Sequence, residues 1–194
     1  MKTSWFELVD TKKKNELFDE KWTKICEENN FIYVSKPFEE LNASGIVRYL
    51  IKDAQENFIG TVEFVPFTPG GYSVIQHYAD FHGVKKYIEN QQYVYEISKL
   101  SIDQERRSEG HLEKILSLLA DFSKNYEAKY FIASMNSKLF DTLTRFGIRL
   151  EQTFDTLVYD TYSLVPCEFN IENLERDLKT SRWYKRQQRN LLKI

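Results

Sequence analysis

The stretch EISKLSIDQERRSEGHL, residues 96–112, decides how this chain is expected to fold. Its first part belongs to residues 93–102, whose side chains alternate as they do in a strand. That alternation places Glu96, Ser98 and Leu100 on one face and Lys99 on the other. The charged residues 103–109 predict a turn, and Gly110 precedes a helix with apolar residues at helical spacing.

The flanking sequence extends this strand–turn–helix unit in both directions. Upstream, residues 12–29 predict an amphipathic helix, residues 45–52 and 58–67 predict a hairpin closed by a polar turn at 53–57, and residues 72–90 are irregular or helical. Downstream, we expect a strand at 129–135, a helix that begins at Asn136 or Ser137 and ends at Gly147, a last strand or hairpin at 153–165, and helical sequence from Asn170.

This order of elements predicts an α/β (α+β) fold, a mixed central sheet flanked by helices. The unit from residue 93 to 135 is expected to be a parallel, right-handed crossover. With 194 residues, the chain has room for one domain. We expect that domain to cover residues 1–170, followed by a basic helix or tail at residues 171–194.

Composition narrows the class of protein. The chain is 42% hydrophobic and 15% aromatic, with a net charge of −2, so it is not of the disordered class and has no general attraction to nucleic acid or anionic lipid. Two cysteines and three histidines form no disulfide framework and no metal pattern. The sequence shows neither a signal peptide nor a membrane span. We expect a cytoplasmic protein without a metal.

The C-terminal stretch is basic. Arg182, Lys185, Arg186, Arg189 and Lys193 lie close together, with Trp183 and Tyr184 between them. Such a stretch is most often the solvated end of a terminal helix. The alternative is a nucleic-acid contact, in which the cations bind phosphates and the aromatic side chains stack on bases.

The turn from Arg106 to Leu112 is the best candidate for a phosphate site. The N-terminus of the following helix offers free N–H groups and a positive dipole end, which suit a pyrophosphate. Gly110 allows close approach of the backbone, and Arg106 and Arg107 can add charge-assisted hydrogen bonds. An ordinary turn with two surface arginines is the alternative interpretation of this stretch alone.

The wider pattern resembles the GNAT superfamily of acyltransferases, over residues 45–155. Its acyl-CoA turn reads Gln/Arg-x-x-Gly-x-Gly/Ala; Arg107 and Gly110 match the first two anchors, and Leu112 replaces the final small residue. Residues 100–102 resemble the strand that binds the pantetheine arm through its backbone. The resemblance implies donor contacts from Leu100, Ser101, Ile102, Arg106, Arg107, Ser108, Glu109, Gly110, His111, Leu112 and Asn136.

A narrower resemblance concerns residues 95–100, YEISKL. They are similar to the Trp-Glu-x-Ser-Arg-Phe signature of acyl-homoserine-lactone synthases and N-acyl amino acid synthases, which take acyl chains from acyl carrier protein or CoA. Lys99 stands where that signature has Arg, and Glu63 stands where many members have Arg. Leu143 stands where many GNAT enzymes have a Tyr that protonates the thiolate.

These resemblances imply an N-acyltransferase that moves an acetyl or longer acyl group from acyl-CoA, acetyl-CoA or acyl carrier protein to a small amine. Glu96 is the first candidate for the base that removes the amine proton, Glu63 is the second, and Ser98 is expected to orient the substrate. His111 is expected to be a solvated or capping residue. The alternative is a degraded GNAT-fold protein that binds CoA or a protein partner without turnover.

Overall fold

A computed structural model describes residues 5–28, 33–71, 73–107 and 109–180. The chain forms two compact units, Met1–Pro66 with Ile97–Lys114 and Phe67–Glu96 with Ile115–Ile194. Strand β4 (Val94–Ile102) and helix α4 (Leu112–Tyr126) each have residues in both units. Within the described residues, eight strands form one mixed sheet in the order β1-β2-β3-β4-β5-β8-β6, with β7 paired to β8.

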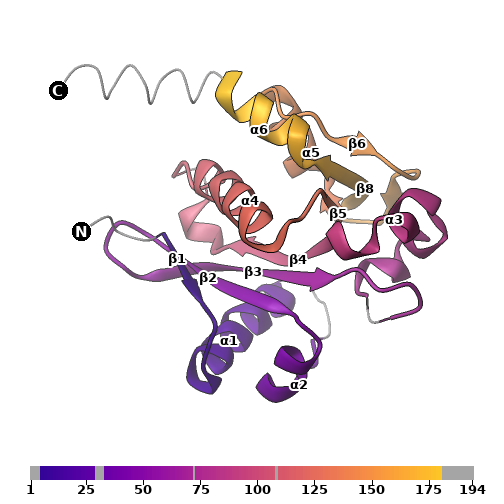
Figure 1. The fold of residues 1–194 in the computed structure, drawn as a ribbon. Helices are drawn as coiled ribbons and strands as arrows, with labels where there is room; N and C mark the ends of the chain where they lie inside the picture. The colour runs from indigo at the N-terminus through magenta and orange to yellow at the C-terminus, as the bar shows by residue number, and fades with distance from the viewer. Residues whose placement is uncertain (1–4, 29–32, 72, 108, 181–194) are drawn as a thin grey trace. The chain divides into compact units, whose positions relative to one another are not determined.

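The first unit is built on a three-stranded antiparallel part of the sheet. It comprises β1 (Phe6–Leu8), α1 (Lys12–Glu28), α2 (Phe38–Ala43), β2 (Val47–Lys52), β3 (Phe58–Pro66) and the 3₁₀ turn η4 (Gln104–Arg106). Figure 1 shows α1 and α2 on one side of β2 and β3. Phe18 of α1 is completely buried and packs with Val9 and Leu50. Burial of such apolar side chains holds α1 on the strands.

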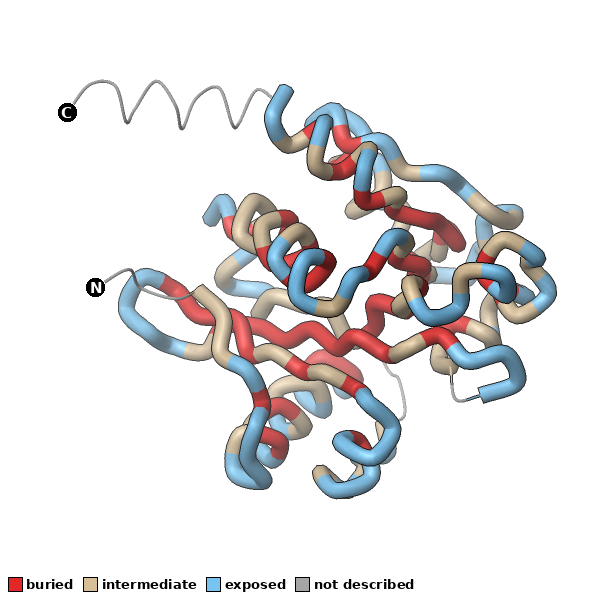
Figure 2. Tube along the Cα trace, viewed as in Figure 1, coloured by how far each residue is buried: buried red, intermediate tan, exposed pale blue. Residues whose placement is uncertain are grey.

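The second unit contains the parallel pairing of the sheet. It comprises the turns η1 (Ile75–His77), η2 (Phe81–Gly83) and η3 (Gln91–Tyr93), the helices α3 (Lys85–Glu89), α5 (Ser137–Arg145) and α6 (Ile171–Thr180), and the strands β5 (Tyr130–Asn136), β6 (Glu151–Gln152), β7 (Leu157–Val158) and β8 (Ser163–Asn170). The start of β4, from Val94 to Glu96, pairs in parallel with β5, and β5 pairs antiparallel with β8. Figure 2 shows buried residues, in red, along these central strands.

The predicted fold class and the order of the main elements are confirmed. The structure adds two elements that the sequence pattern did not reveal, the short strand β1 and the short helix α2. The expected last strand or hairpin at 153–165 is a hairpin of β7 and β8, of which β8 extends to Asn170, and β6 before it also pairs with β8. Helical structure after residue 170 is confirmed as far as Thr180. The division into residues 1–170 and 171–194 stays a prediction, and the basic residues from 182 onward lie outside the described residues.

The expected alternation along β4 is wrong at Lys99. Its φ angle is 49°, in the left-handed region that a non-glycine residue rarely occupies. A left-handed residue inside a strand breaks the two-residue period, as it does in a β-bulge. Ser98 and Lys99 were expected on opposite faces, yet both side chains bind the same carboxylate, that of Glu63. The strand therefore brings two consecutive side chains to one partner.

Strands β3 and β4 approach closely beside Gly60. A Cβ atom at Gly60 would lie 2.3 Å from the carbonyl oxygen of Ser101, which is well inside any real contact. On either side of this point, Thr61 Oγ1 donates to the carbonyl oxygen of Lys99 at 2.8 Å and Asp103 N donates to that of Ile59 at 2.8 Å. The close approach thus depends on a glycine at position 60.

We predict that Gly60→Ala lowers the free energy of unfolding by about 1–3 kcal/mol, because the added methyl group must push the two strands apart. The very short distance to Ser101 favours the upper end of this range. Urea unfolding followed by circular dichroism measures the loss. Gly70→Ala is the matched control, since Gly70 has a φ of 72° but open space around its Cβ position. That variant carries only backbone strain. Equal losses in the two variants would contradict the close-packing argument.

Candidate active site

The expected donor strand and phosphate turn lie in the first unit. Leu100, Ser101 and Ile102 are half-buried at the end of β4. The chain then passes through η4 and reaches the N-terminus of α4, a fifteen-residue helix that begins at Leu112. The predicted order of strand, turn and helix is therefore present.

The two arginines of the turn have different surroundings. Arg106 is held by two carboxylates: its Nη2 lies 3.0 Å from Asp53 Oδ2, and its Nε lies 3.0 Å from Glu109 Oε2. Arg107 is exposed, and its Nε donates to the carbonyl oxygen of Ile102 at 3.0 Å. Toward the described residues, Arg107 thus keeps most of its guanidinium N–H donors for a ligand, whereas Arg106 would have to share its donors with Asp53 and Glu109.

Gly110 has a φ of 82°, and a Cβ atom there would meet nothing within 4 Å. The backbone beside it is therefore accessible, as a phosphate site requires. Asn136 lies directly before α5 and caps it, since its side chain accepts a hydrogen bond from Lys138 N at 3.0 Å, which confirms the expected start of that helix. Ser108 lies outside the described residues. The role of each of these residues toward a donor stays a prediction.

His111 is buried, with 6% of its surface exposed, so it is not solvated; it lies directly before α4, and the capping alternative stays a prediction. Its Nε2 lies 3.2 Å from Glu109 Oε2, and its Nδ1 lies 3.2 Å from Lys114 Nζ. Lys114 in turn lies over the ring of Trp5. The imidazole is thus a packed link between the turn and the first turn of α4.

A cavity of about 650 Å³ lies in the same unit. Its lining comes from α1, from the hairpin that joins β2 to β3, and from the turn after β4: Lys24, Glu28, Asp53, Asn57, Phe58, Ile59, Asp103, Gln104, Glu105 and Arg106. Asp53 is 1% exposed and accepts hydrogen bonds from the backbone of Gln55 and Asn57. The sequence pattern gave no reason to select Asp53, although it fixes both its own turn and Arg106.

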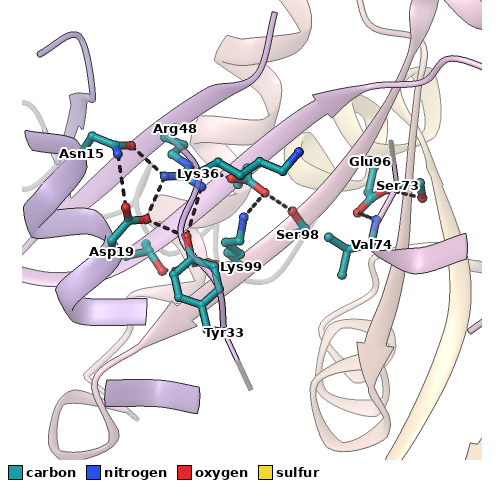
Figure 3. Close-up of polar contacts among 12 residues, drawn as sticks. Asn15, Asp19, Tyr33, Lys36, Arg48, Ser73, Val74, Glu96, Ser98 and Lys99 are labelled. Atoms are coloured by element: carbon teal, nitrogen blue, oxygen red, sulfur yellow. Dashed lines mark hydrogen bonds and ion pairs between the residues drawn. The ribbon is translucent and has the colours of Figure 1, made fainter. Parts of the chain in front are cut away.

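Glu63 lies at the centre of a buried polar network in the first unit. Figure 3 labels the three side chains that donate to it, Arg48, Ser98 and Lys99. The Glu63 side chain has no exposed surface and accepts from three donors. Arg48 Nε lies 2.6 Å from Oε2, while Lys99 Nζ and Ser98 Oγ lie 2.5 and 2.9 Å from Oε1. Glu63 faces the buried guanidinium of Arg48, which β2 places directly opposite it.

The charges around Glu63 set its proton affinity. Burial would raise the pKa of this carboxyl group, but the charges of Lys99 and Arg48, with their hydrogen bonds, outweigh burial and lower the pKa below its usual value. Burial lowers the pKa of the Lys99 ammonium, and the attraction of Glu63 only partly offsets this. A carboxylate with a lowered pKa is a weak base, which makes Glu63 better suited to positioning than to proton transfer.

Arg48 connects this carboxylate to α1. Its Nη1 lies 2.7 Å from Asn15 Oδ1 and 2.9 Å from Asp19 Oδ1, and Tyr33 OH donates to Asp19 at 2.6 Å. The guanidinium also lies over the ring of Phe18, 4.5 Å from its centroid. Sequence reasoning missed Arg48. The sequence does hold a signal for it, since the predicted hairpin pairs Arg48 with Glu63 once the register of the two strands is fixed.

Glu96 lies in the part of β4 that belongs to the second unit, and it is 2% exposed. Ser73 Oγ donates to it at 2.7 Å and the backbone N of Val74 at 3.2 Å (Figure 3). The connection between β3 and β4, which was the most ambiguous sequence, thus supplies the partners of the first candidate base.

The structure gives less support to a cysteine nucleophile or to a metal site. Cys26 and Cys167 are buried and free, and burial raises the pKa of both thiols, which does not suit a nucleophile. In the part of the chain that the structure describes, His, Cys, Asp and Glu form no group of three that could hold a metal ion. Over the same residues, none of the helices is both long and apolar enough to cross a membrane.

No protein-family model matches the sequence, and no curated protein sequence matches it either. Solved structures do match. FeeM, an N-acyl amino acid synthase from uncultured soil microbes, is 11% identical over 89% of this chain and 93% of its own, with a TM-score of 0.67. BjaI, a CoA-dependent acyl-homoserine lactone synthase bound to SAM and isopentyl-CoA, is 11% identical over 86% of this chain and 81% of its own, with a TM-score of 0.61.

A third match is a chimera of the spermidine N-acetyltransferase SpeG from Vibrio cholerae and hSSAT, 14% identical over 89% of this chain and 99% of its own, with a TM-score of 0.54. The structural neighbours are thus the branch that residues 95–112 resemble, together with GNAT acetyltransferases. The chain has the GNAT-like fold of these acyltransferases.

We predict that Glu63→Gln lowers the free energy of unfolding by about 3–5 kcal/mol at pH 7, because it leaves Arg48 and Lys99 buried without their counter-charge. The pKa of Glu63 is lowered from 4.5 in the folded state, so ionised Glu63 contributes its full stability above that value. The contribution is lost as the pH falls through the lower, folded-state pKa.

The difference between wild type and Glu63→Gln should therefore stay constant from pH 7 to about pH 5 and shrink below it. Urea midpoints measured across this range give the profile. Glu56→Gln is the control, since Glu56 is largely exposed and pairs with Lys52 at the surface. A difference that grows toward acid pH would contradict the lowered pKa.

Proposed function

We propose that this chain is a cytoplasmic N-acyltransferase that moves an acyl group from acyl-CoA to a small amine. One observation carries the proposal: a buried carboxylate, Glu96, lies on the same strand as the half-buried donor segment Leu100–Ile102. A base and a donor site on one strand meet the two requirements of the reaction, removal of the amine proton and positioning of the thioester.

The donor would lie along Leu100, Ser101 and Ile102, with its phosphates at the turn. Arg106, Arg107, Gly110 and the N-terminus of α4 provide the positive charge and N–H groups. The neighbours support this donor, since BjaI is CoA-dependent and was solved with isopentyl-CoA. Acetyl-CoA and acyl carrier protein remain the other donors that the proposal includes.

The chemical step is direct transfer. The amine nitrogen attacks the thioester carbonyl carbon, a C–N bond forms and the C–S bond breaks. Glu96 accepts the amine proton, and the thiolate leaves and takes up a proton to become free CoA thiol. A backbone N–H of β4 near Leu100 would bind the oxyanion. Ser98 would orient the acceptor, and Glu63 would hold the strand in place.

A second candidate is a protein that binds CoA without turnover. Leu143, which stands where many GNAT enzymes have the Tyr acid, is 2% exposed and has no proton to give. Thiol release separates the two candidates. The enzyme releases CoA thiol from acyl-CoA when amines are present, whereas the binder gains thermal stability from CoA and releases none.

Arg107→Ala is predicted to weaken CoA binding by about 1–3 kcal/mol in calorimetry, because the variant loses a charge-assisted bond to phosphate. Arg145→Ala is the control, since Arg145 is an exposed arginine on α5. It should bind CoA as wild type does. Unchanged affinity in Arg107→Ala would remove the phosphate site from this turn.

Glu96→Gln is predicted to lower the rate of transfer by about 10²–10⁴-fold, the range of general acid–base catalysis, while CoA affinity stays the same. The acid-side limb of the pH–rate profile should disappear with the carboxylate. Glu168→Gln is the control, because Glu168 is another buried glutamate of the second unit, paired with Lys86. Full activity in Glu96→Gln would exclude Glu96 as the base.

A further inference from the structure

The buried positive charges of the first unit are all matched by carboxylates. Among its described residues, the buried cationic side chains are Arg48, Lys52 and Lys99. Lys52 pairs with Glu56 at 2.8 Å and with Glu7 at 3.2 Å. Arg48 and Lys99 share Glu63, and Arg48 also pairs with Asp19. No buried cation there is left to bind an anion.

Two of these cations share one carboxylate beside the proposed donor segment. Lys99 directly precedes the donor segment Leu100–Ile102, and Ser98 beside it donates to the same carboxylate as Lys99 does. Only 7% of the Lys99 side chain and 2% of the Arg48 side chain are exposed. Both are therefore desolvated, and their pairing with Glu63 is electrostatically strong.

We propose that the acceptor is a primary amine that carries no carboxylate group. This inference rests on the proposed N-acyltransferase function. A carboxylate entering beside the donor strand would have to take Arg48 or Lys99 away from Glu63, which would leave the Glu63 carboxylate buried with too few partners. Glu63 thus occupies, from within the chain, the position that a substrate carboxylate would need. The proposal departs from what the name of FeeM, an N-acyl amino acid synthase, would suggest.

The test uses pairs of acceptors that differ only by the carboxylate: tyramine and L-tyrosine, phenethylamine and L-phenylalanine, putrescine and L-ornithine. With acetyl-CoA and octanoyl-CoA as donors, thiol release gives kcat/KM for each acceptor. Wild type should prefer the amine of each pair by at least about tenfold. An equal or higher value for the amino acids would overturn the proposal.

A variant reverses the preference if Glu63 is responsible for it. Glu63→Gln removes the internal carboxylate, which leaves Lys99 without its carboxylate partner and Arg48 paired with Asp19. The ratio of amino acid to amine should therefore rise by at least about tenfold. Glu56→Gln is the matched control, because it removes one carboxylate from another buried cation, Lys52, which keeps its pair with Glu7, and should leave the ratio unchanged. A folded Glu63→Gln protein with the wild-type ratio would contradict the proposal.

A second variant covers the case in which Glu63→Gln does not fold. The double change Arg48→Met with Glu63→Met replaces the buried pair by apolar side chains of similar size, which cores often tolerate. Lys99 then has no carboxylate on β3, and the ratio should again shift toward the amino acid. Adding Lys99→Met should abolish that shift. A triple variant that keeps the shift would show that Lys99 is not the carboxylate-binding group.

Direct binding separates this inference from the function on which it rests. If no amine releases thiol, the proposed function fails, and saturation-transfer NMR with tyramine and L-tyrosine still measures recognition. Wild type should bind tyramine and not tyrosine, and Glu63→Gln should bind tyrosine. Binding of both by wild type, or of neither, would overturn the inference.

Discussion

A fully buried carboxylate, that of Glu63, constrains the first unit more than any other single group. Its desolvation is tolerated because Arg48, Lys99 and Ser98 all donate to it. These partners come from β2 and β4, and Arg48 reaches on to Asn15 and Asp19 of α1. The network therefore joins one helix and three strands, and none of these elements can shift without leaving a buried charge without its partner.

The same carboxylate accounts for the irregular course of β4. A regular strand presents one residue in two to a given face, so it offers Glu63 either Ser98 or Lys99. The left-handed φ of Lys99 lets both reach it. Such a conformation is unfavourable by about 1–2 kcal/mol, and the charge-assisted bond from Lys99 offsets it. Beyond Lys99, the strand backbone lies close against Gly60. The irregular residue thus lies directly before the proposed donor segment.

The sequence predicts elements with a long, regular pattern: α1, the hairpin, β4, α4, β5 and α5. It does not predict β1 or α2, with three and six residues, because elements this short depend on tertiary contacts rather than on periodicity. In the candidate site, Glu96 and the turn from Arg106 to Leu112 follow from the sequence. The burial of Glu63 does not, because its desolvation depends on the packing of α1. Arg48 becomes recognisable only once the hairpin register is known.

Two departures from the synthase signature gain a joint explanation. Lys99 replaces an Arg, and Glu63 occupies a position where many members have Arg; separately, each suggests a site that has lost its function. In the structure these two side chains are bound to each other, and Arg48 completes the charge balance. Random loss of function removes the pressure to keep a site polar, and a change to one partner leaves an uncompensated charge that destabilises the core by several kcal/mol. A set of compensated charges beside the proposed donor segment instead fits the proposed change of acceptor, since specificity changes when a site gains repulsion against one substrate as well as attraction for another.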